Sequence, residues 1–335
     1  MTLPIPPYFE AEQVGKVWRV PYENRANQAS DWAREYRLQP AVLDKNRIWL
    51  LLVDVQNTFC IPEYELFVAG RSGKAAIDDN IRLCYFIYHN LDKITEISAT
   101  MDTHLSQQIF HAIFFVDKNG HHPAQYTSIQ AIDLETQRWR FNPSLATQFG
   151  ITADIGQKLV VHYAHELEKN GKYALTIWPY HAMLGGIGHA LVSAVEEAVF
   201  FHSMARLSQP SFEIKGNRPF TENYSAIGPE VTLGPKGDAL GEHNYKFIKT
   251  LQQVKAVIIA GQAKSHCVAW TISDLLKDIN EIDKELAKKV YLLEDCTSPV
   301  VVPDADFTDA GNEAFEEFSK SGMHLVRSTD NFLEF

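Results

Sequence analysis

The sequence predicts an α/β protein of the doubly wound, Rossmann-like kind, with a mainly parallel six-stranded sheet and helices on both faces. Residues 48–53 and 256–260 are continuous apolar runs rich in branched side chains, as expected for strands that are buried on both sides. Other stretches place apolar residues three and four positions apart, which is typical of helices that cover a sheet. Strands and helices alternate along the chain, and this order favours one parallel sheet.

Residues 1–46 contain several prolines and aromatic residues without a clear period, so we expect an ordered extension that wraps the domain. Residues 47–335 are predicted to form a single α/β domain, because no second apolar core is evident in the pattern. Its strands are expected at 48–53, 96–101, 173–177, 211–214, 256–260, 289–293 and 324–326, and its helices at 74–91, 189–207, 242–253, 268–276 and 306–319.

Residues from about 105 to 172 do not fit this alternation. The apolar run at 109–116 is consistent with a strand or with a buried cover, and residues 118–123 have the composition of a turn. The remainder is polar with scattered aromatic residues. We therefore predict an insertion that lies over one end of the sheet.

Composition narrows the classes of partner. The chain has 335 residues, a net charge of −11 and no basic run, which argues against nucleic acid or an anionic membrane surface as a partner. No stretch is apolar enough to span a bilayer, and the first residues lack the features of a signal peptide. The four cysteines lie far apart without a CxxC pair, which is typical of reduced thiols in a cytoplasmic protein. The composition is compatible with a homo-oligomer and does not select an oligomeric state.

Polar residues follow the predicted strands at several places where each strand ends. Ligands of open α/β sheets bind off the carboxyl ends of the strands, so these residues are expected to meet at one site. Each has an ordinary structural explanation by itself, such as a helix cap or a turn, but their coincidence favours a functional site. The residues are Asp54, Asp102 with His104, Trp178 with His181, Lys215 and Cys267.

Cys267 follows strand 256–260, which Gly261 ends, and precedes a helix. The free N–H groups at such a helix start are expected to favour the thiolate and lower the thiol pKa. A lone buried cysteine is more often an inert apolar filler. The prediction that Cys267 is reactive therefore depends on the residues at the other strand ends.

Two blocks of sequence resemble the cysteine hydrolases that include nicotinamidase, isochorismatase and N-carbamoylsarcosine amidase. The block Leu51-Leu-Val-Asp54-Val-Gln-Asn-Thr-Phe59 is similar to the family motif V-D-x-Q-N-D-F. The block Gly261-Gln-Ala-Lys-Ser-His-Cys267-Val is similar to its nucleophile motif G-x-A-T-x-x-C-V. The resemblance covers roughly residues 47–104 and 173–330, and it implies the isochorismatase-like fold.

The resemblance implies that Cys267 is the nucleophile, Asp54 its general base and Lys215 the third member of a catalytic triad. It also implies an oxyanion hole formed by the backbone N–H groups of Ala263 and Cys267, preceded by a cis peptide at Gln262–Ala263. These roles are chemically consistent, because a thiolate attacks carbonyl groups readily, a neighbouring lysine favours the thiolate, and a carboxylate can carry the proton.

A metal site is also implied. Asp102-Thr-His104 and Trp178-Pro-Tyr-His181 resemble the D-x-H and W-P-x-H pattern of nicotinamidases, so Asp102, His104 and His181 are expected to hold a divalent ion. Zinc is the first expectation, with iron or manganese as alternatives. His111 is a candidate fourth ligand whose spacing fits the pattern poorly.

The resemblance further implies that Phe59 and Trp178 flank the ring of a substrate. The sequence departs from the family pattern at Thr58, which replaces the usual Asp, at Thr103, where Trp is frequent, and at Lys264, which replaces the usual Thr.

The sequence therefore predicts a metal-assisted cysteine amidohydrolase that cleaves a small amide through a thioester, with conversion of nicotinamide to nicotinate and ammonia as the leading reaction. Two alternatives stay open. One is a relative that acts on another small amide, a ureido compound or isochorismate, and the other is an inactive member that only binds a small molecule.

Overall fold

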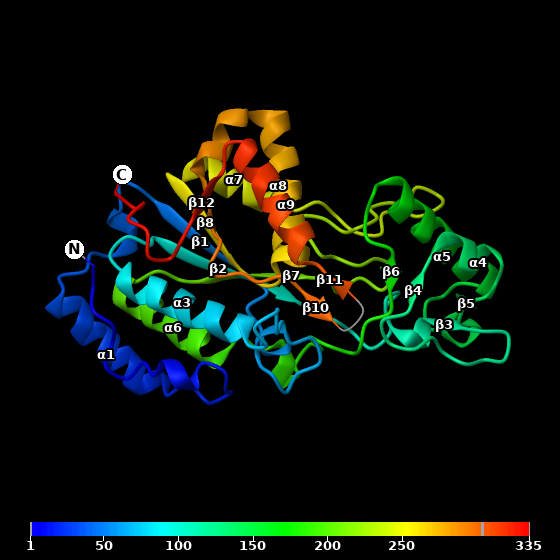
Figure 1. Ribbon diagram of the computed structural model, residues 1–335, viewed down its shortest axis with the longest axis horizontal. Coiled ribbons are helices and arrows are strands. Elements are labelled where there is room, and N and C mark those ends of the chain that lie inside the picture. Colours follow the sequence, from blue (N-terminus) through cyan, green and yellow to red (C-terminus); the bar gives the residue numbers. More distant parts are fainter. Residues whose placement is uncertain (1, 303–304, 335) are drawn as a thin grey trace.

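A computed structural model describes residues 2–302 and 305–334 of the chain. Within these residues the central sheet has six strands, all parallel, in the order β12-β9-β8-β1-β2-β7 (Figure 1). Both β1 and β8 are buried along their whole length, as the continuous apolar runs predict. The strands are β1 (Ile48–Val53), β2 (Glu96–Asp102), β7 (Ser211–Lys215), β8 (Ala256–Gly261), β9 (Val290–Leu293) and β12 (His324–Val326).

Helices cover both faces of the sheet, each over its own apolar core (Figure 1). Alternate residues of β1 point to opposite faces, so Leu50 and Leu52 pack under α3 and α6, whereas Leu51 and Val53 pack under α7, α8 and α9. The N-terminal segment adds α1, which packs against α6. The helices are α1 (Tyr22–Glu35), α3 (Ala75–His89), α6 (Ser193–Arg206), α7 (Lys246–Gln253), α8 (Ala269–Ile282) and α9 (Thr308–Lys320).

The predicted strand at 173–177 is wrong as a member of the central sheet. Only β6 (Leu175–Thr176) forms there, and it pairs antiparallel with β4 (Ser128–Ile129) in a separate two-stranded sheet. A short apolar run shows that a segment is buried but not which strand it pairs with, because that choice depends on residues far away in the sequence. The other six candidate segments form the central sheet.

Residues 105–178 form an insertion lobe that extends from one end of the sheet (Figure 1). The lobe has an apolar core of its own, which the sequence pattern did not indicate, and Phe220, Val231 and Leu240 from the later loop complete it. Gly156 lies against the ring of Phe141, and any larger residue would collide with that ring. The lobe contains β3 (Phe115–Val116), β4, α4 (Ala131–Glu135), β5 (Arg140–Phe141), α5 (Ala153–Lys169) and β6.

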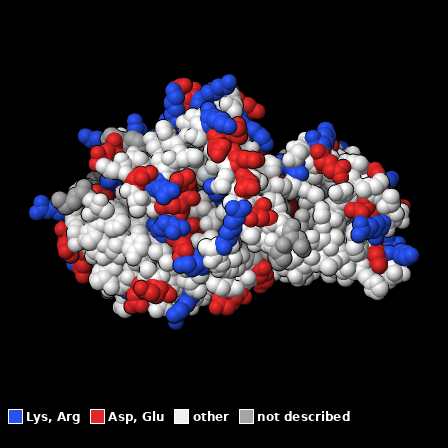
Figure 2. All heavy atoms as spheres, in the orientation of Figure 1, with Lys and Arg blue, Asp and Glu red and all other residues white. Residues whose placement is uncertain are grey.

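Three short elements stand near the carboxyl ends of the strands. The helix α2 (Asn57–Cys60) follows β1, and the pair β10 (Val301–Val302) and β11 (Ala305–Asp306) follows β9. In the described residues, no helix is both long and apolar enough to cross a membrane. Lys and Arg side chains lie among Asp and Glu side chains over the face shown in Figure 2, so neither sign of charge dominates that face.

His202 links α6 to the loop before β2 and predicts a pH dependence of stability. Its ring is 1% exposed, and Nε2 donates a hydrogen bond to the Ile94 carbonyl at 2.9 Å. Burial lowers the pKa of His202 to about 4, and the nearby Arg206 acts in the same direction. The unfolded chain takes up this proton near pH 6.5, so the folded state loses stability as the pH falls from 6.5 towards 4.

We expect His202→Gln to keep the hydrogen bond to Ile94 but to remove this loss. Near pH 4.5 the wild-type protein should lose roughly 2 to 3 kcal/mol more of its free energy of unfolding, relative to pH 7, than the variant loses. Urea unfolding at the two pH values measures the difference. The exposed His324→Gln is the control and should behave like wild type, and an equal loss in the His202 variant would contradict the assignment.

Candidate active site

Four neighbouring strands bring the predicted polar residues together. Asp54 directly follows β1, Asp102 and Lys215 end β2 and β7, and Cys267 lies in the turn after β8. The parallel register places Asp102 opposite Lys215, and Val53 opposite Gly261. Because the carboxyl ends of parallel strands meet at one edge, residues more than 200 positions apart in sequence share a single site.

Lys215 is the centre of this site. Its Nζ lies 2.9 Å from Asp54 Oδ2, 2.9 Å from Asp102 Oδ1 and 3.6 Å from Cys267 Sγ. It also donates a hydrogen bond to the Asn223 carbonyl at 2.8 Å. Lys215 is buried, and so are Asp54, Asp102 and Cys267. The three members of the predicted triad are therefore in contact.

The ionisation of the triad differs from the expectation for Cys267. Burial raises the pKa of the Cys267 thiol well above its usual range, although Lys215 opposes this effect. The sequence predicted a lowered pKa from the helix start, and that prediction is wrong because Cys267 lies inside a buried π-helical turn (Lys264–Val268). The thiol therefore needs a base to remove its proton.

Asp54 has the properties of such a base. Burial raises the pKa of Asp54, which makes the carboxylate a better proton acceptor, while Lys215 opposes the shift. Its Oδ1 accepts a hydrogen bond from the Thr100 hydroxyl at 2.5 Å, which leaves Oδ2 towards Lys215. Burial alone would lower the pKa of Lys215, but Asp102 and Asp54 together raise it well above its usual value, so the lysine stays charged.

The backbone before Cys267 has the form expected for an oxyanion hole. Gly261 has a φ of +121°, and a Cβ there would lie 2.0 Å from the Val53 carbonyl oxygen, so only glycine fits. The peptide Gln262–Ala263 is cis, as the resemblance implied. Among the described residues the Ala263 N–H makes no hydrogen bond, and Ala263 lines the same pocket as Cys267.

Asp102, His104 and His181 form a group whose candidate ligand atoms all lie within 4.8 Å of one another. The Nε2 atoms of His104 and His181 lie 2.7 Å and 3.5 Å from Asp102 Oδ2. The other ring nitrogens, both Nδ1, lie 3.1 Å from the Gly216 carbonyl and 2.8 Å from the Pro179 carbonyl. Backbone carbonyls that orient histidine rings in this way are typical of metal ligands, so the donor set fits a divalent ion.

The same group includes a strongly acidic carboxyl. Burial alone would raise the pKa of Asp102, but His104 and Lys215 hold it well below its usual range, so it stays an anionic ligand.

His111 lies outside the group in the described structure, with its ring centroid 6.2 Å from that of His104. It is fully buried, and neither ring nitrogen has a hydrogen-bond partner among the described residues.

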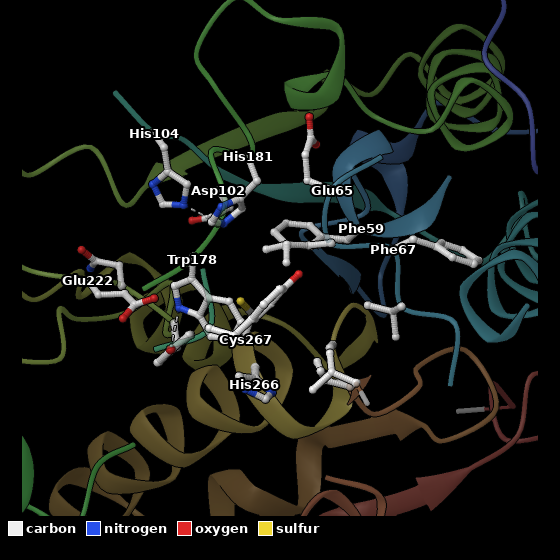
Figure 3. Close-up of a pocket in the computed structure, with 18 of the residues that line it drawn as sticks. Phe59, Glu65, Phe67, Asp102, His104, Trp178, His181, Glu222, His266 and Cys267 are labelled. Atoms are coloured by element: carbon white, nitrogen blue, oxygen red, sulfur yellow. Dashed lines mark hydrogen bonds and ion pairs between the residues drawn. The ribbon is translucent and has the colours of Figure 1, made fainter. Parts of the chain in front are cut away.

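Cys267, Ala263 and the group of Asp102, His104 and His181 line a single pocket, whereas Asp54 and Lys215 are not part of its lining (Figure 3). In the figure, Phe59 and Trp178 lie on opposite sides of the Cys267 sulfur, and Asp102, His104 and His181 gather next to one another. The sequence interpretation missed the rest of the lining, which includes the polar and aromatic side chains of Tyr126, Glu222, Tyr224 and His266. His266 directly precedes Cys267, so its position next to the nucleophile could have indicated it, whereas the other three lie in loops without a pattern.

Backbone hydrogen bonds inside the insertion lobe hold the segment that carries Trp178 and leads to His181. The Trp178 N–H donates to the Phe110 carbonyl at 2.8 Å, and the Ile177 N–H donates to the Thr127 carbonyl at 2.9 Å. The hydroxyl of Tyr173 donates to the Ser265 carbonyl at 2.9 Å, which ties this segment to the turn of the nucleophile. The insertion is therefore part of the scaffold of the pocket.

The departures from the family motifs lie beside the triad without touching it. The hydroxyl of Thr58 donates to Glu65 at 3.2 Å, and Thr103 lies 2.8 Å from His189 Nε2. The Nζ of Lys264 donates to Asn312 on α9 at 2.8 Å. None of these contacts involves Asp54, Lys215 or Cys267.

Comparisons with known proteins agree on the fold. No family model matches the sequence, and no curated protein resembles it in sequence. The structure is similar to yeast nicotinamidase, with a TM-score of 0.50 and 21% identity over 83% of this chain and 99% of that chain. It also matches a nicotinamidase and pyrazinamidase of Acinetobacter baumanii (TM-score 0.48, 16% identity, 86% and 99% covered) and an N-carbamoylsarcosine amidase of Thermoplasma acidophilum (0.40, 13%, 85% and 99%).

The six parallel strands and the similarity to the yeast enzyme give this chain the isochorismatase-like α/β fold. At these identities the similarity shows the fold alone, and the chemistry has to be argued from the site.

The site predicts one reactive cysteine among the four. Cys267 lines the pocket and has Asp54 as a neighbouring base, whereas Cys60, Cys84 and Cys296 are at most 1% exposed and line no part of this pocket. We expect iodoacetamide to alkylate Cys267 on the order of 100-fold faster than the other three in the native protein. Mass spectrometry of timed samples measures this, Cys267→Ser should abolish the early label, and earlier labelling of another cysteine would contradict the prediction.

Proposed function

We propose that this protein is a metal-assisted cysteine amidohydrolase that acts on a small aromatic amide, with nicotinamide as the leading substrate. The observation that carries the proposal is that Cys267 and the Asp102, His104 and His181 group line one pocket between two aromatic side chains. A nucleophile supported by a base and a cation suits attack on an amide carbonyl. The flanking aromatic residues suit a planar ring.

In the proposed reaction, Asp54 takes the proton of the Cys267 thiol as the sulfur attacks the amide carbon. The raised pKa of Asp54 supports this step because it makes the carboxylate a better proton acceptor, and Lys215 opposes the rise that burial causes in the pKa of the thiol. Lys215, 3.6 Å from the sulfur, stabilises the developing thiolate by its positive charge.

The attack places negative charge on the carbonyl oxygen, and the N–H groups of Ala263 and Cys267 are the donors proposed to stabilise it. The C–N bond then breaks, and Asp54 returns the proton to the leaving nitrogen, which departs as ammonia. A thioester on Cys267 remains. Asp54 activates a water that cleaves this thioester, which releases the carboxylic acid and regenerates the thiol.

Asp102, His104 and His181 are proposed to hold one divalent ion. Three protein ligands leave open positions on the ion, and a bound ion supplies a Lewis acid that anchors a ring nitrogen. Asp102 also contacts Lys215, so the same carboxylate couples the metal group to the triad.

The charge of the pocket argues against the anionic alternatives. Glu65 and Glu222 line it, and its lining among the described residues includes no Lys or Arg side chain. Burial raises the pKa of Glu222 well above its usual range, so Glu65 is the anionic member of this pair. Isochorismate and N-carbamoylsarcosine carry carboxylates, and the described lining offers them no Lys or Arg side chain to pair with. An inactive binding protein is disfavoured as well, because Asp54, Lys215 and Cys267 are all present and in contact.

We expect the protein to release ammonia and nicotinate from nicotinamide, and Cys267→Ala to lower this turnover by about 10⁴-fold or more, because the nucleophile is lost. A coupled ammonia assay measures it. Cys84→Ala, a core cysteine remote from the pocket, is the matched control and should stay active if folded. Absence of ammonia from nicotinamide, with turnover of other small amides, would overturn the choice of substrate but not the thiol chemistry.

We expect the purified protein to contain about one zinc, iron or manganese ion per chain, and His181→Ala to lose most of it, because one of three ligands is removed. Elemental analysis after dialysis measures the content. His324→Ala, an exposed histidine, is the control. Removal of the ion by a chelator should abolish turnover while iodoacetamide still labels Cys267, and full turnover without any ion would contradict the anchoring role.

A further inference from the structure

The pocket continues beyond the catalytic groups into a wall of apolar side chains, which we call the apolar collar. It consists of Leu66, Phe67, Tyr126, Val300 and Val301. Three separate segments contribute to it: the loop after α2, the insertion lobe and the strand β10 with the residue before it. Each of the five side chains is partly exposed. Partly exposed apolar side chains gathered around one pocket indicate a surface that an apolar group covers.

The collar extends from Tyr126, which adjoins Trp178, to Phe67, which lies farther from the reacting atoms. In Figure 3, Phe67 lies beyond Phe59, on the side away from Trp178 and from the metal group. The pocket has a cavity volume of about 110 Å³ and opens to solvent. A cavity of this volume takes about one aromatic ring, so any further group on a bound amide would leave the cavity across the collar at its mouth.

Tyr126 is held in the collar by the backbone of the insertion lobe. Its φ of +66° lies in the left-handed region, which a tyrosine adopts only at a cost. The Tyr126 N–H donates to the Ile177 carbonyl at 2.6 Å, and its ring packs edge-on to Trp178 at 6.0 Å and 90°. With 47% of its surface exposed, the ring is fixed at the open side of the pocket.

The charges around the pocket restrict what the collar accepts. Glu222 is 7% exposed and Glu65 is exposed, and both line the pocket. Glu65 is next to Leu66 and Phe67 in the chain, so an anionic group in the collar would approach its carboxylate, and the described lining contains no Lys or Arg side chain to pair with that group. An uncharged apolar group would instead bury its surface against the collar.

We propose that the preferred substrate is an aromatic amide with an uncharged apolar extension that lies in the apolar collar, and that Tyr126 is the residue that selects this extension. The proposal builds on the amidohydrolase function above and specifies its substrate class. The reaction at the amide is unchanged, and the extension contributes binding energy at a distance from the reacting bond.

The test compares nicotinamide with its 4-, 5- and 6-propyl derivatives and with the matching 2-carboxyethyl derivatives, which are similar in size but anionic. At least one propyl derivative should exceed nicotinamide in kcat/KM by about tenfold, since a buried propyl group provides well over 1.4 kcal/mol. Its carboxyethyl counterpart should be slower than nicotinamide. Tyr126→Ala should reduce the preference for the propyl derivative over nicotinamide by about fivefold or more, and Tyr126→Phe should retain it.

Tyr245→Ala is the matched control, because Tyr245 is similarly exposed but lies at the start of α7, outside this pocket, and it should leave the preference unchanged. If every propyl derivative is slower than nicotinamide, or if Tyr126→Ala leaves the preference intact, the collar does not select substrate and the proposal is wrong.

Protection of Cys267 separates this proposal from the choice of nicotinamide. Propyl-bearing aromatic amides should slow iodoacetamide labelling of Cys267 at lower concentrations than nicotinamide does, and Tyr126→Ala should remove the difference. If nicotinamide is not hydrolysed but this protection is observed, the nicotinamidase assignment fails while the collar proposal holds. If nicotinamide is hydrolysed and no extended amide protects better, the collar proposal fails alone.

Discussion

Lys215 between two carboxylates is the interaction on which the site depends. Its ammonium group lies 2.9 Å from both Asp54 and Asp102, at the ends of three adjacent strands. A buried charge is costly unless it is paired, and here each carboxylate stabilises the lysine while the lysine keeps Asp102 ionised. Loss of Lys215 would leave two buried carboxyl groups without the cation that they share. The nucleophile is also placed against this cluster, 3.6 Å from Nζ.

The cluster also couples two groups with different proposed roles. Asp102 contacts Lys215 through Oδ1 and the two histidines through Oδ2, so one side chain belongs both to the triad and to the metal group. A change in the charge of the metal group therefore alters the electrostatic interaction of Asp102 with Lys215, the lysine that supports the thiolate. In the proposed enzyme, binding of a ring at the ion and attack at the sulfur are not independent events.

The insertion lobe contributes to the site through its backbone. Hydrogen bonds from Trp178 and Ile177 to Phe110 and Thr127 orient the segment that ends at His181. The lobe has its own apolar core, so this segment rests on a rigid support rather than on a free loop. The same support presents Tyr126 at the open side of the pocket.

The sequence by itself determined the sheet and the residues at its strand ends. Buried parallel strands such as 48–53 and 256–261 are continuous apolar runs, and the polar residue that follows each run is visible without a structure. Asp54, Asp102, Lys215 and Cys267 were therefore found from local pattern and motif. The helix α5 was missed although Leu159, Val160, Tyr163 and Leu167 follow a helical spacing, because the surrounding polar residues obscured it.

Only the tertiary structure decided which residues touch. The antiparallel pairing of 175–176 with 128–129, the contact of Tyr126 with Trp178 and the position of Glu222 in the pocket depend on long-range packing that no local period encodes. The raised pKa of Cys267 is also a tertiary property, since it arises from burial, whereas the sequence indicated only a helix start. A local pattern indicates the secondary-structure propensity of a segment and whether the segment is buried. It does not indicate which distant residues the segment contacts, because the free energy of a contact depends on both partners.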